Sequence, residues 1–174
     1  MACLLSLGMQ AQSVFRFAQL TDLHLSPNNP NPTEDLLRSV AQINATDNID
    51  FVLVTGDITE EGDRATMEKV KSCLDLLKVK YYVALGNHET KWSDSGCTAF
   101  GEIFGSERFE FEHKGFLFLG FNSGPLMRMA YGHVVPQDIR WMTERMEQAG
   151  KDKPVILVTH YPLKDGDVDN WYEV

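Results

Sequence analysis

Residues 51–57 read Phe-Val-Leu-Val-Thr-Gly-Asp, and this stretch decides the fold class. An unbroken apolar run of this kind is typical of a strand that is buried on both faces, as in a parallel sheet covered by helices. Gly56 and Asp57 end the run, since glycine permits a sharp turn and aspartate is a common turn residue. The stretch therefore predicts an α/β protein whose buried strand ends in an acidic turn.

Similar signals extend on both sides of this run. We expect strands at 14–20, 51–55, 81–85, 109–112, 116–121 and 155–159. Helical periodicity predicts helices at 34–46, from Asp63 onward and at 136–149. Thr33 stands at the N-cap position of the first helix, and 91–105 is expected to be a loop with a short helix. The order of elements, with strands alternating with helices, is that of an α/β domain.

Polar residues with metal-ligand chemistry follow four of the expected strands. They are Asp22, His24, Asp57, Asn87 and His160. Each alone is more often a turn or cap residue. Because parallel sheets gather ligand sites at the carboxyl ends of their strands, the set together predicts one site.

The residue types in this set fit two adjacent divalent cations. Asp22 and His24, two positions apart, can hold one cation, and Asp57 can bridge both because a carboxylate has two oxygens. Asn87 and His160 can supply an amide oxygen and an imidazole to the second cation. His88 directly follows Asn87 and would point elsewhere, which suits a catalytic group beside the metals rather than a ligand.

These motifs resemble those of a known family. D-x-H, G-D, G-N-H-E and a later histidine occur in the order and with the gaps of the calcineurin-like metallophosphoesterases, from about Phe15 to Tyr161. QLTDLHL and TGDITEEG look most like the part of the family with the Ser/Thr phosphatases and class III cyclic-nucleotide phosphodiesterases. Glu60 stands where purple acid phosphatases have a metal-binding tyrosine, which argues against that branch.

The resemblance implies a fold, a cofactor and a reaction. The fold is a metallophosphatase-like α/β sandwich of two mixed sheets flanked by helices. Asp22, His24 and Asp57 would bind one divalent metal, and Asp57, Asn87 and His160 the other, with Mn, Fe or Zn expected. A metal-bridging hydroxide would hydrolyse a phosphoester of a small molecule or a phosphoprotein.

The resemblance also implies two catalytic residues. His88 would stabilise the transition state or protonate the departing oxygen. Glu89 would orient His88 or serve as an outer carboxylate.

One family motif is missing from the printed sequence. The family closes with G-H-x-H after the histidine that corresponds to His160, whereas Gly132-His133 precedes it and is read as a surface or supporting histidine. We therefore expect 13–174 to be a catalytic domain truncated at its C-terminus. A degraded, non-catalytic metal-binding relative that acts as an interaction module, or a partner chain that supplies the missing histidines, are the alternatives.

Composition and the N-terminal sequence limit the possible partners and the cellular localisation. The chain has 174 residues, 43% of them hydrophobic, and a net charge of −9, which argues against a basic face for nucleic acid. Phosphate remains compatible, because bound cations reverse the local field. No apolar run approaches the roughly 20 residues that span a bilayer. Residues 1–12 resemble a signal-peptide remnant or a disordered extension, so we expect export to the periplasm or cell exterior, with the cytoplasm still possible. The oligomeric state is not predicted.

Overall fold

The computed structural model describes residues 14–93, 95–125 and 132–163. The expected leader at 1–12 lies outside these residues, as does the segment after Leu163. Among the described helices, none has the length and apolar character needed to cross a membrane.

The first sheet contains three parallel strands joined by helical crossovers. They are β1 (Phe17–Leu20), β2 (Phe51–Thr55) and β3 (Lys80–Ala84), in the spatial order β1-β2-β3. Helix α1 (Asn31–Ala45) connects the first pair, and α2 (Arg64–Leu74) connects the second. All five residues of β2 are buried, so the prediction of a covered central strand is confirmed.

The second sheet combines a hairpin with one parallel strand. Strands β4 (Phe109–His113) and β5 (Phe116–Gly120) are antiparallel, and β6 (Val155–Val158) pairs with β5 in parallel. Lys114 and Gly115 form the hairpin turn with φ angles of 44° and 87°, the left-handed pair that a tight two-residue turn requires. Helix α4 (Pro136–Ala149) carries the chain back to the start of β6.

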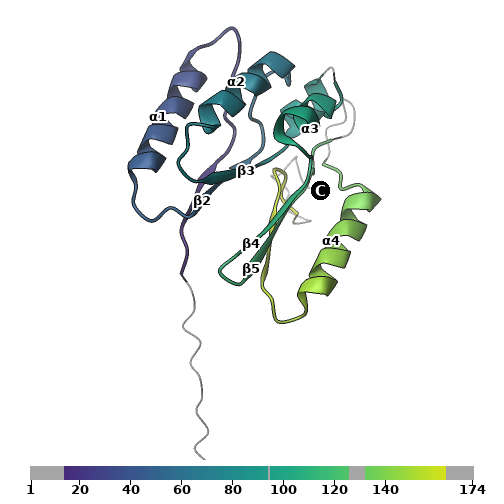
Figure 1. The fold of residues 1–174 in the computed structure, drawn as a ribbon. Helices are drawn as coiled ribbons and strands as arrows, with labels where there is room; N and C mark the ends of the chain where they lie inside the picture. Colours follow the sequence, from purple (N-terminus) through teal and green to yellow (C-terminus); the bar gives the residue numbers. More distant parts are fainter. Residues whose placement is uncertain (1–13, 94, 126–131, 164–174) are drawn as a thin grey trace, which may run out of the picture.

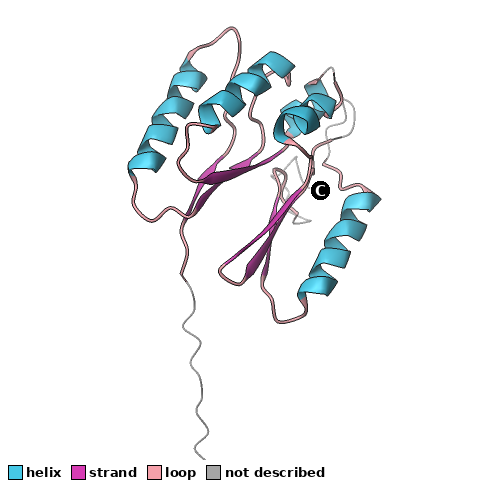
Figure 2. Ribbon diagram, viewed as in Figure 1, coloured by secondary structure: helices cyan, strands magenta, loops and turns pink. Residues whose placement is uncertain are grey.

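The elements stack in four layers (Figure 1). Helices α1 and α2 cover the outer face of the first sheet, the two sheets face each other, and α4 covers the outer face of the second sheet. Two short helices, η1 (His88–Trp92) and α3 (Thr98–Phe104), lie between β3 and β4 in the chain. The colouring by secondary structure separates the helical layers from the paired sheets clearly (Figure 2).

The predicted α/β sandwich of two sheets flanked by helices is therefore confirmed. The second sheet is mixed as expected, whereas the three described strands of the first sheet are all parallel. The physical reason is the connection: β2 and β3 are each reached through a helix, and a helical crossover returns the chain to the same end of the sheet.

Two helix starts show how well local rules worked. The helix predicted from Asp63 onward is α2, and Asp63 is its N-cap, since its Oδ1 accepts a hydrogen bond from the main-chain N–H of Thr66 at 2.9 Å. The prediction that Thr33 caps the first helix is wrong, because α1 begins at Asn31. Pro30 occupies the N-cap position and its carbonyl accepts the N–H of Glu34 at 3.1 Å. Pro32 within the first turn favours this earlier start, because its fixed φ is already helical.

An aromatic core joins the two sheets. Phe51 and Leu53 of β2 point to the second sheet, while their neighbours Val52 and Val54 point to α1 and α2. Phe118 of β5 is fully buried and packs edge-on against Phe51, with 5.2 Å between ring centroids. Successive side chains of β2 thus point to opposite faces of the sheet, so that one strand packs against both the helices and the second sheet.

Replacing Phe118 by alanine should strongly destabilise the protein. The change removes a fully buried ring from the contact between the sheets and leaves a cavity, at a cost of about 3–5 kcal/mol in the free energy of unfolding. Phe17→Ala is the matched control, because that ring is 38% exposed and should cost roughly 1 kcal/mol. Urea denaturation followed by circular dichroism measures both, and equal losses would contradict this view of the core.

Candidate metal centre and active site

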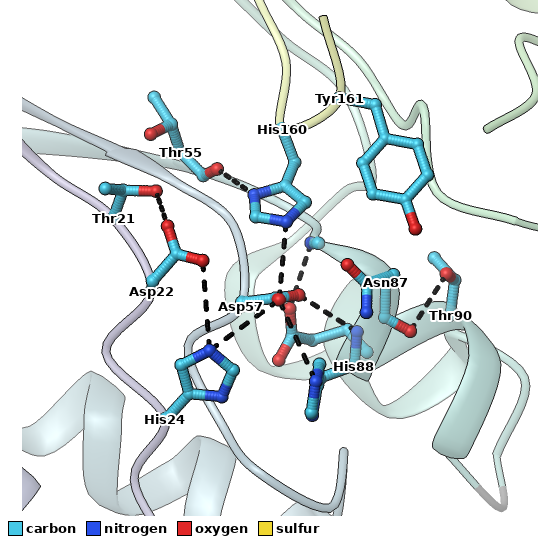
Figure 3. A network of polar contacts seen from close by, with 12 residues as sticks. Thr21, Asp22, His24, Thr55, Asp57, Asn87, His88, Thr90, His160 and Tyr161 are labelled. Carbon is cyan, nitrogen blue, oxygen red and sulfur yellow. Dashed lines mark hydrogen bonds and ion pairs between the residues drawn. The ribbon is translucent and has the colours of Figure 1, made fainter. Parts of the chain in front are cut away.

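The loops after β1 and β2 remain paired beyond the ends of the strands. The main-chain N–H groups of Asp22 and His24 donate to the carbonyls of Gly56 and Asp57 at 3.1 and 3.0 Å. The N–H of Leu25 continues the pattern, donating to Ile58 at 3.2 Å. These bonds hold the two acidic turns side by side, so that their polar side chains converge (Figure 3).

Three residues of these turns adopt left-handed backbone conformations. The φ angles are 52° at Asp22, 45° at His24 and 51° at Asp57. Aspartate and histidine enter this region more readily than most side chains, but the conformation still costs free energy. Such strain concentrates at functional sites, where the surrounding structure compensates for it. Here the paired loops fix the turns, which aim the side chains at one point.

The carboxylate of Asp57 is the centre of the cluster. Its side chain is buried, and Oδ2 lies 3.3 Å from Nε2 of His160, 3.8 Å from Nε2 of His24 and 3.9 Å from Nε2 of His88. Oδ1 accepts the main-chain N–H of His88 at 3.0 Å. Burial, the largest influence, raises the pKa of this carboxyl, but the hydrogen bonds from His160 and His88 outweigh it and the net pKa is lowered. Asp57 is therefore an anion faced by imidazoles.

His160 brings the second sheet into the site. It follows β6, and its Nδ1 contacts the carbonyl oxygen of Thr55, at the end of β2, at 2.8 Å. Because a carbonyl only accepts, Nδ1 carries the proton and Nε2 faces Asp57. Burial lowers the pKa of His160 most, but the hydrogen bond and charge of Asp57 raise it above its ordinary value.

The ring of His88 is held by the main chain. Its Nδ1 lies 2.5 Å from the carbonyl oxygen of Glu60, which leaves Nε2 on the side of Asp57. The expectation that Glu89 orients His88 is not met by any contact among the described residues. The reason is the position of Glu89 in the first turn of η1, from which its carboxylate reaches the main chain instead.

Glu89 joins the loops that carry Asp57 and His88. Its fully buried carboxylate accepts the main-chain N–H and the hydroxyl of Thr59, at 3.0 and 2.9 Å, and the N–H of Gly86 at 2.9 Å. Burial, the largest cause, raises the pKa of Glu89, and the nearby charge of Asp57 adds to the increase. These hydrogen bonds fix the two loops relative to each other.

The remaining predicted ligands lie in the same group. Asn87 is the N-cap residue of η1, directly before His88, and Figure 3 includes it with the residues around Asp57. Ligand atoms of Asp22, His24 and Asp57 lie within 4.8 Å of one another, and so do those of His24, Glu60 and His88. The structure thus gathers the predicted residues, while their roles as ligands stay predictions.

Two glycines permit this close convergence. A Cβ on Gly56 would lie 2.8 Å from Gly86 and from the Cβ of His160, and Gly56 also has a φ of 97°. A Cβ on Gly86 would overlap the main-chain nitrogen and Oδ1 of Asp57. The ends of β2, β3 and β6 therefore approach as closely as they do because these two positions lack side chains.

Sequence reasoning passed over three contributors to the site. Glu60 had been noted only as a departure from one branch of the family, and Thr59 was not singled out. The third is Ser123, whose buried hydroxyl accepts the N–H of Tyr161 at 2.9 Å. These residues act through contacts made after folding, which the spacing of motifs does not reveal. His133 is exposed, and its described hydrogen bond runs from its main chain to Ser123.

Comparison with known proteins gives a consistent result. The sequence profile of the calcineurin-like phosphoesterases matches residues 15–173. A 3′,5′-cyclic-nucleotide phosphodiesterase of Nostoc sp. is 24% identical over 153 residues, which are 84% of this chain and 56% of the relative. A probable cyclic nucleotide phosphodiesterase of Coxiella burnetii is 23% identical over 85% of this chain and 60% of its own length.

A third relative is named for a different substrate. It is a probable glycerophosphodiester phosphodiesterase of Arcobacter nitrofigilis, 26% identical over 67% of this chain and 44% of the relative. The chain thus spans between 44% and 60% of the length of these three relatives.

Gly86→Ala should disturb the site and the fold together. The added methyl group overlaps Asp57, so either the carboxylate or the backbone must move, at a cost of about 1–3 kcal/mol in the free energy of unfolding. Gly101→Ala is the matched control, because a Cβ there meets nothing within 4 Å and alanine is favoured inside α3. Denaturant unfolding should show a loss for the first variant and no loss for the second.

Proposed function

Because the chain belongs to the calcineurin-like phosphoesterase family, we propose that it hydrolyses phosphoester bonds with the help of two divalent metal ions. The observation that carries the proposal is the buried carboxylate of Asp57, whose Oδ2 is faced by the Nε2 atoms of His24, His88 and His160 within 3.9 Å. Imidazole nitrogens and carboxylate oxygens directed at one point are the ligand types of zinc, iron and manganese centres.

The residues present fit a pair of cations. Among the described residues, Asp57 forms ion pairs with histidines and none with lysine or arginine. A buried carboxylate without a basic partner is well suited to a metal. Asp22, His24 and Asp57 would hold one ion, and Asp57, Asn87 and His160 the other, with Mn, Fe or Zn as candidates. When bound, such ions polarise phosphoryl oxygens and activate water as the nucleophile.

His88 is the proposed catalytic residue of the chain. The carbonyl of Glu60 engages Nδ1, so Nε2 is the atom available to the substrate. Protonated at both nitrogens, the ring would stabilise negative charge on the phosphoryl group and pass its Nε2 proton to the departing oxygen. Glu89 would support this geometry by joining the loop of Gly86 to the loop of Thr59, next to Asp57.

We propose a small-molecule phosphodiester as the substrate class. The support comes from the relatives, which are named as cyclic-nucleotide and glycerophosphodiester phosphodiesterases. A phosphomonoester or a phosphoprotein is the alternative within the same chemistry. Parallel assays with bis(p-nitrophenyl) phosphate and p-nitrophenyl phosphate distinguish diesterase from monoesterase activity, and faster cleavage of the monoester would overturn the proposed class.

Export of the chain is a separate proposal. Its support is the sequence MACLLSLGMQAQ at residues 1–12, which resembles the end of a signal peptide. N-terminal sequencing of protein from its native source would test it, and a retained residue 1 would contradict cleavage.

Asp57→Asn and His88→Ala should each reduce phosphoester hydrolysis. We expect a loss of about 10²–10⁴-fold in kcat for His88→Ala, the usual contribution of a general acid. Asp57→Asn should also weaken metal binding, because it removes the charge between the imidazoles. His133→Ala is the control and should keep full activity, since that side chain is exposed and outside the cluster. If metals bind but neither variant changes the rate, the chain is a non-catalytic relative.

Removing metal ions should abolish hydrolysis and lower the melting temperature. A ligand that binds only the native state at 100 times its Kd stabilises it by about 2.7 kcal/mol. We expect EDTA treatment and dialysis to lower Tm, and added Mn²⁺ or Zn²⁺ to restore both Tm and activity. Asp57→Asn is the control, because its Tm should respond far less to the same additions. Full activity after complete metal removal would refute the proposal.

A further inference from the structure

Glu60 contacts two imidazoles of the site with two different groups. Its carboxylate Oε2 lies 2.9 Å from Nδ1 of His24, and its main-chain carbonyl oxygen lies 2.5 Å from Nδ1 of His88. The two rings stand edge to face, with 4.6 Å between their centroids. Glu60 therefore contacts Nδ1 of both rings.

The backbone around Glu60 is firmly placed. Its N–H donates to the carbonyl of Leu25 at 2.8 Å, and Leu25 and Thr59 form a parallel bridge. Leu25 directly follows His24, so the loop that carries His24 and the loop that carries Glu60 are hydrogen-bonded to each other. The contact between the carboxylate and the imidazole thus joins two segments whose main chains are already fixed.

The contact at Nδ1 determines which of the two ring nitrogens carries the proton. A neutral imidazole carries one proton, and an acceptor beside Nδ1 keeps it there, which leaves a lone pair on Nε2. The Nε2 atoms of His24 and His88 lie 3.8 and 3.9 Å from Oδ2 of Asp57, on the side of the proposed metals. For His24 this is the tautomer that a metal ligand needs.

The carboxylate is the partner that the structure offers to His24. Nδ1 of His24 is buried and forms no aligned hydrogen bond, although Oε2 of Glu60 is within hydrogen-bond distance. The side chain of Glu60 is 47% exposed, so a rotation of the carboxylate can align the contact. Contacts of this kind often tighten only when a site is loaded.

A direct metal ligand is the competing role for Glu60, since its carboxylate forms a ligand group with His24 and His88. The geometry favours a supporting role, because Glu60 meets Nδ1 of His24 while Asp57 faces Nε2 across the ring. A cation held by His24 and Asp57 would bind Nε2 of His24, whereas Glu60 meets Nδ1.

We propose that Glu60 is a positioning residue whose side chain fixes the tautomer of His24 and whose main-chain carbonyl fixes that of His88. The inference rests on the proposed function only in taking His24 as a metal ligand. It has a specific consequence: a substitution removes the carboxylate but not the carbonyl. Changes at Glu60 should therefore weaken metal binding through His24 and leave the ring of His88 in place.

The test compares Glu60→Ala, Glu60→Gln and Glu61→Ala. Glu61→Ala is the matched control, since it removes the same charge one position along the chain from an exposed side chain. Long-range ¹H–¹⁵N spectra of the metal-free proteins report the tautomer of each imidazole. Calorimetric titration with Mn²⁺ reports affinity, and kcat at saturating Mn²⁺ over a range of pH reports on His88.

We expect Glu60→Ala to affect the imidazole of His24 and not that of His88. Glu60→Ala should lose the Nδ1–H preference of His24 alone and bind Mn²⁺ about 10–100-fold more weakly. Glu60→Gln keeps an acceptor oxygen and should largely retain both properties, and Glu61→Ala should match the wild type. At saturating Mn²⁺ the pH profile of kcat should be unchanged by Glu60→Ala.

Two results would overturn the inference. One is a Glu60→Ala protein with the wild-type tautomer of His24, and the other is an altered tautomer of His88 with His24 unchanged. Loss of Mn²⁺ affinity in Glu60→Gln as large as in Glu60→Ala, with both tautomers intact, would indicate a direct ligand and also refute positioning. If the wild type hydrolyses no phosphoester, the proposed function fails, while the metal-free spectra still decide the role of Glu60.

Discussion

The burial of a charged carboxylate at Asp57 is the constraint on which the site depends. An anion removed from water is costly unless hydrogen bonds and opposite charges compensate for it. Here the compensation comes from one main-chain N–H and from imidazoles that reach Asp57 along three separate segments of the chain. Neighbouring Glu89 adds a second buried carboxyl, whose pKa is raised by burial and by the charge of Asp57. A buried carboxylate with imidazoles as its partners, beside a second buried acid, forms an environment that favours a cation.

The position of this carboxylate could be predicted from sequence, because the rule that revealed it is simple. A buried parallel strand must end at the edge of its sheet, and the residues that follow reach the same crevice as those after the neighbouring strands. That argument placed Asp57 and His160 together correctly. It also gave the layers of the fold, since unbroken apolar strands require cover on both faces. The helix start at Asn31 was missed because two prolines outweighed the capping preference of Thr33.

The supporting contacts could not be predicted in the same way. Glu60 reaches His24 only because the loops after β1 and β2 continue to pair, and Glu89 reaches Thr59 only because η1 begins where it does. The left-handed angles at three site residues are equally invisible in composition, since none of the three is glycine. Motif spacing identifies the side chains that face the reacting atoms. The side chains that hold those residues in place depend on the path of the backbone, which the motifs do not give.

The site also couples the two sheets. Asp22, Asp57 and His88 follow strands of the first sheet, but His160 follows β6 of the second. The contact from Nδ1 of His160 to the carbonyl of Thr55 crosses between them at 2.8 Å, at the end of β2, the strand that contributes Phe51 to the aromatic core. Packing of Phe51 against Phe118 and placement of His160 beside Asp57 are therefore consequences of one sheet-to-sheet arrangement. Because side chains in a packed core shift as a unit, a change in how the sheets meet would move the imidazole away from its carboxylate. The aromatic core, though distant from the chemistry along the chain, thus determines whether the site is assembled.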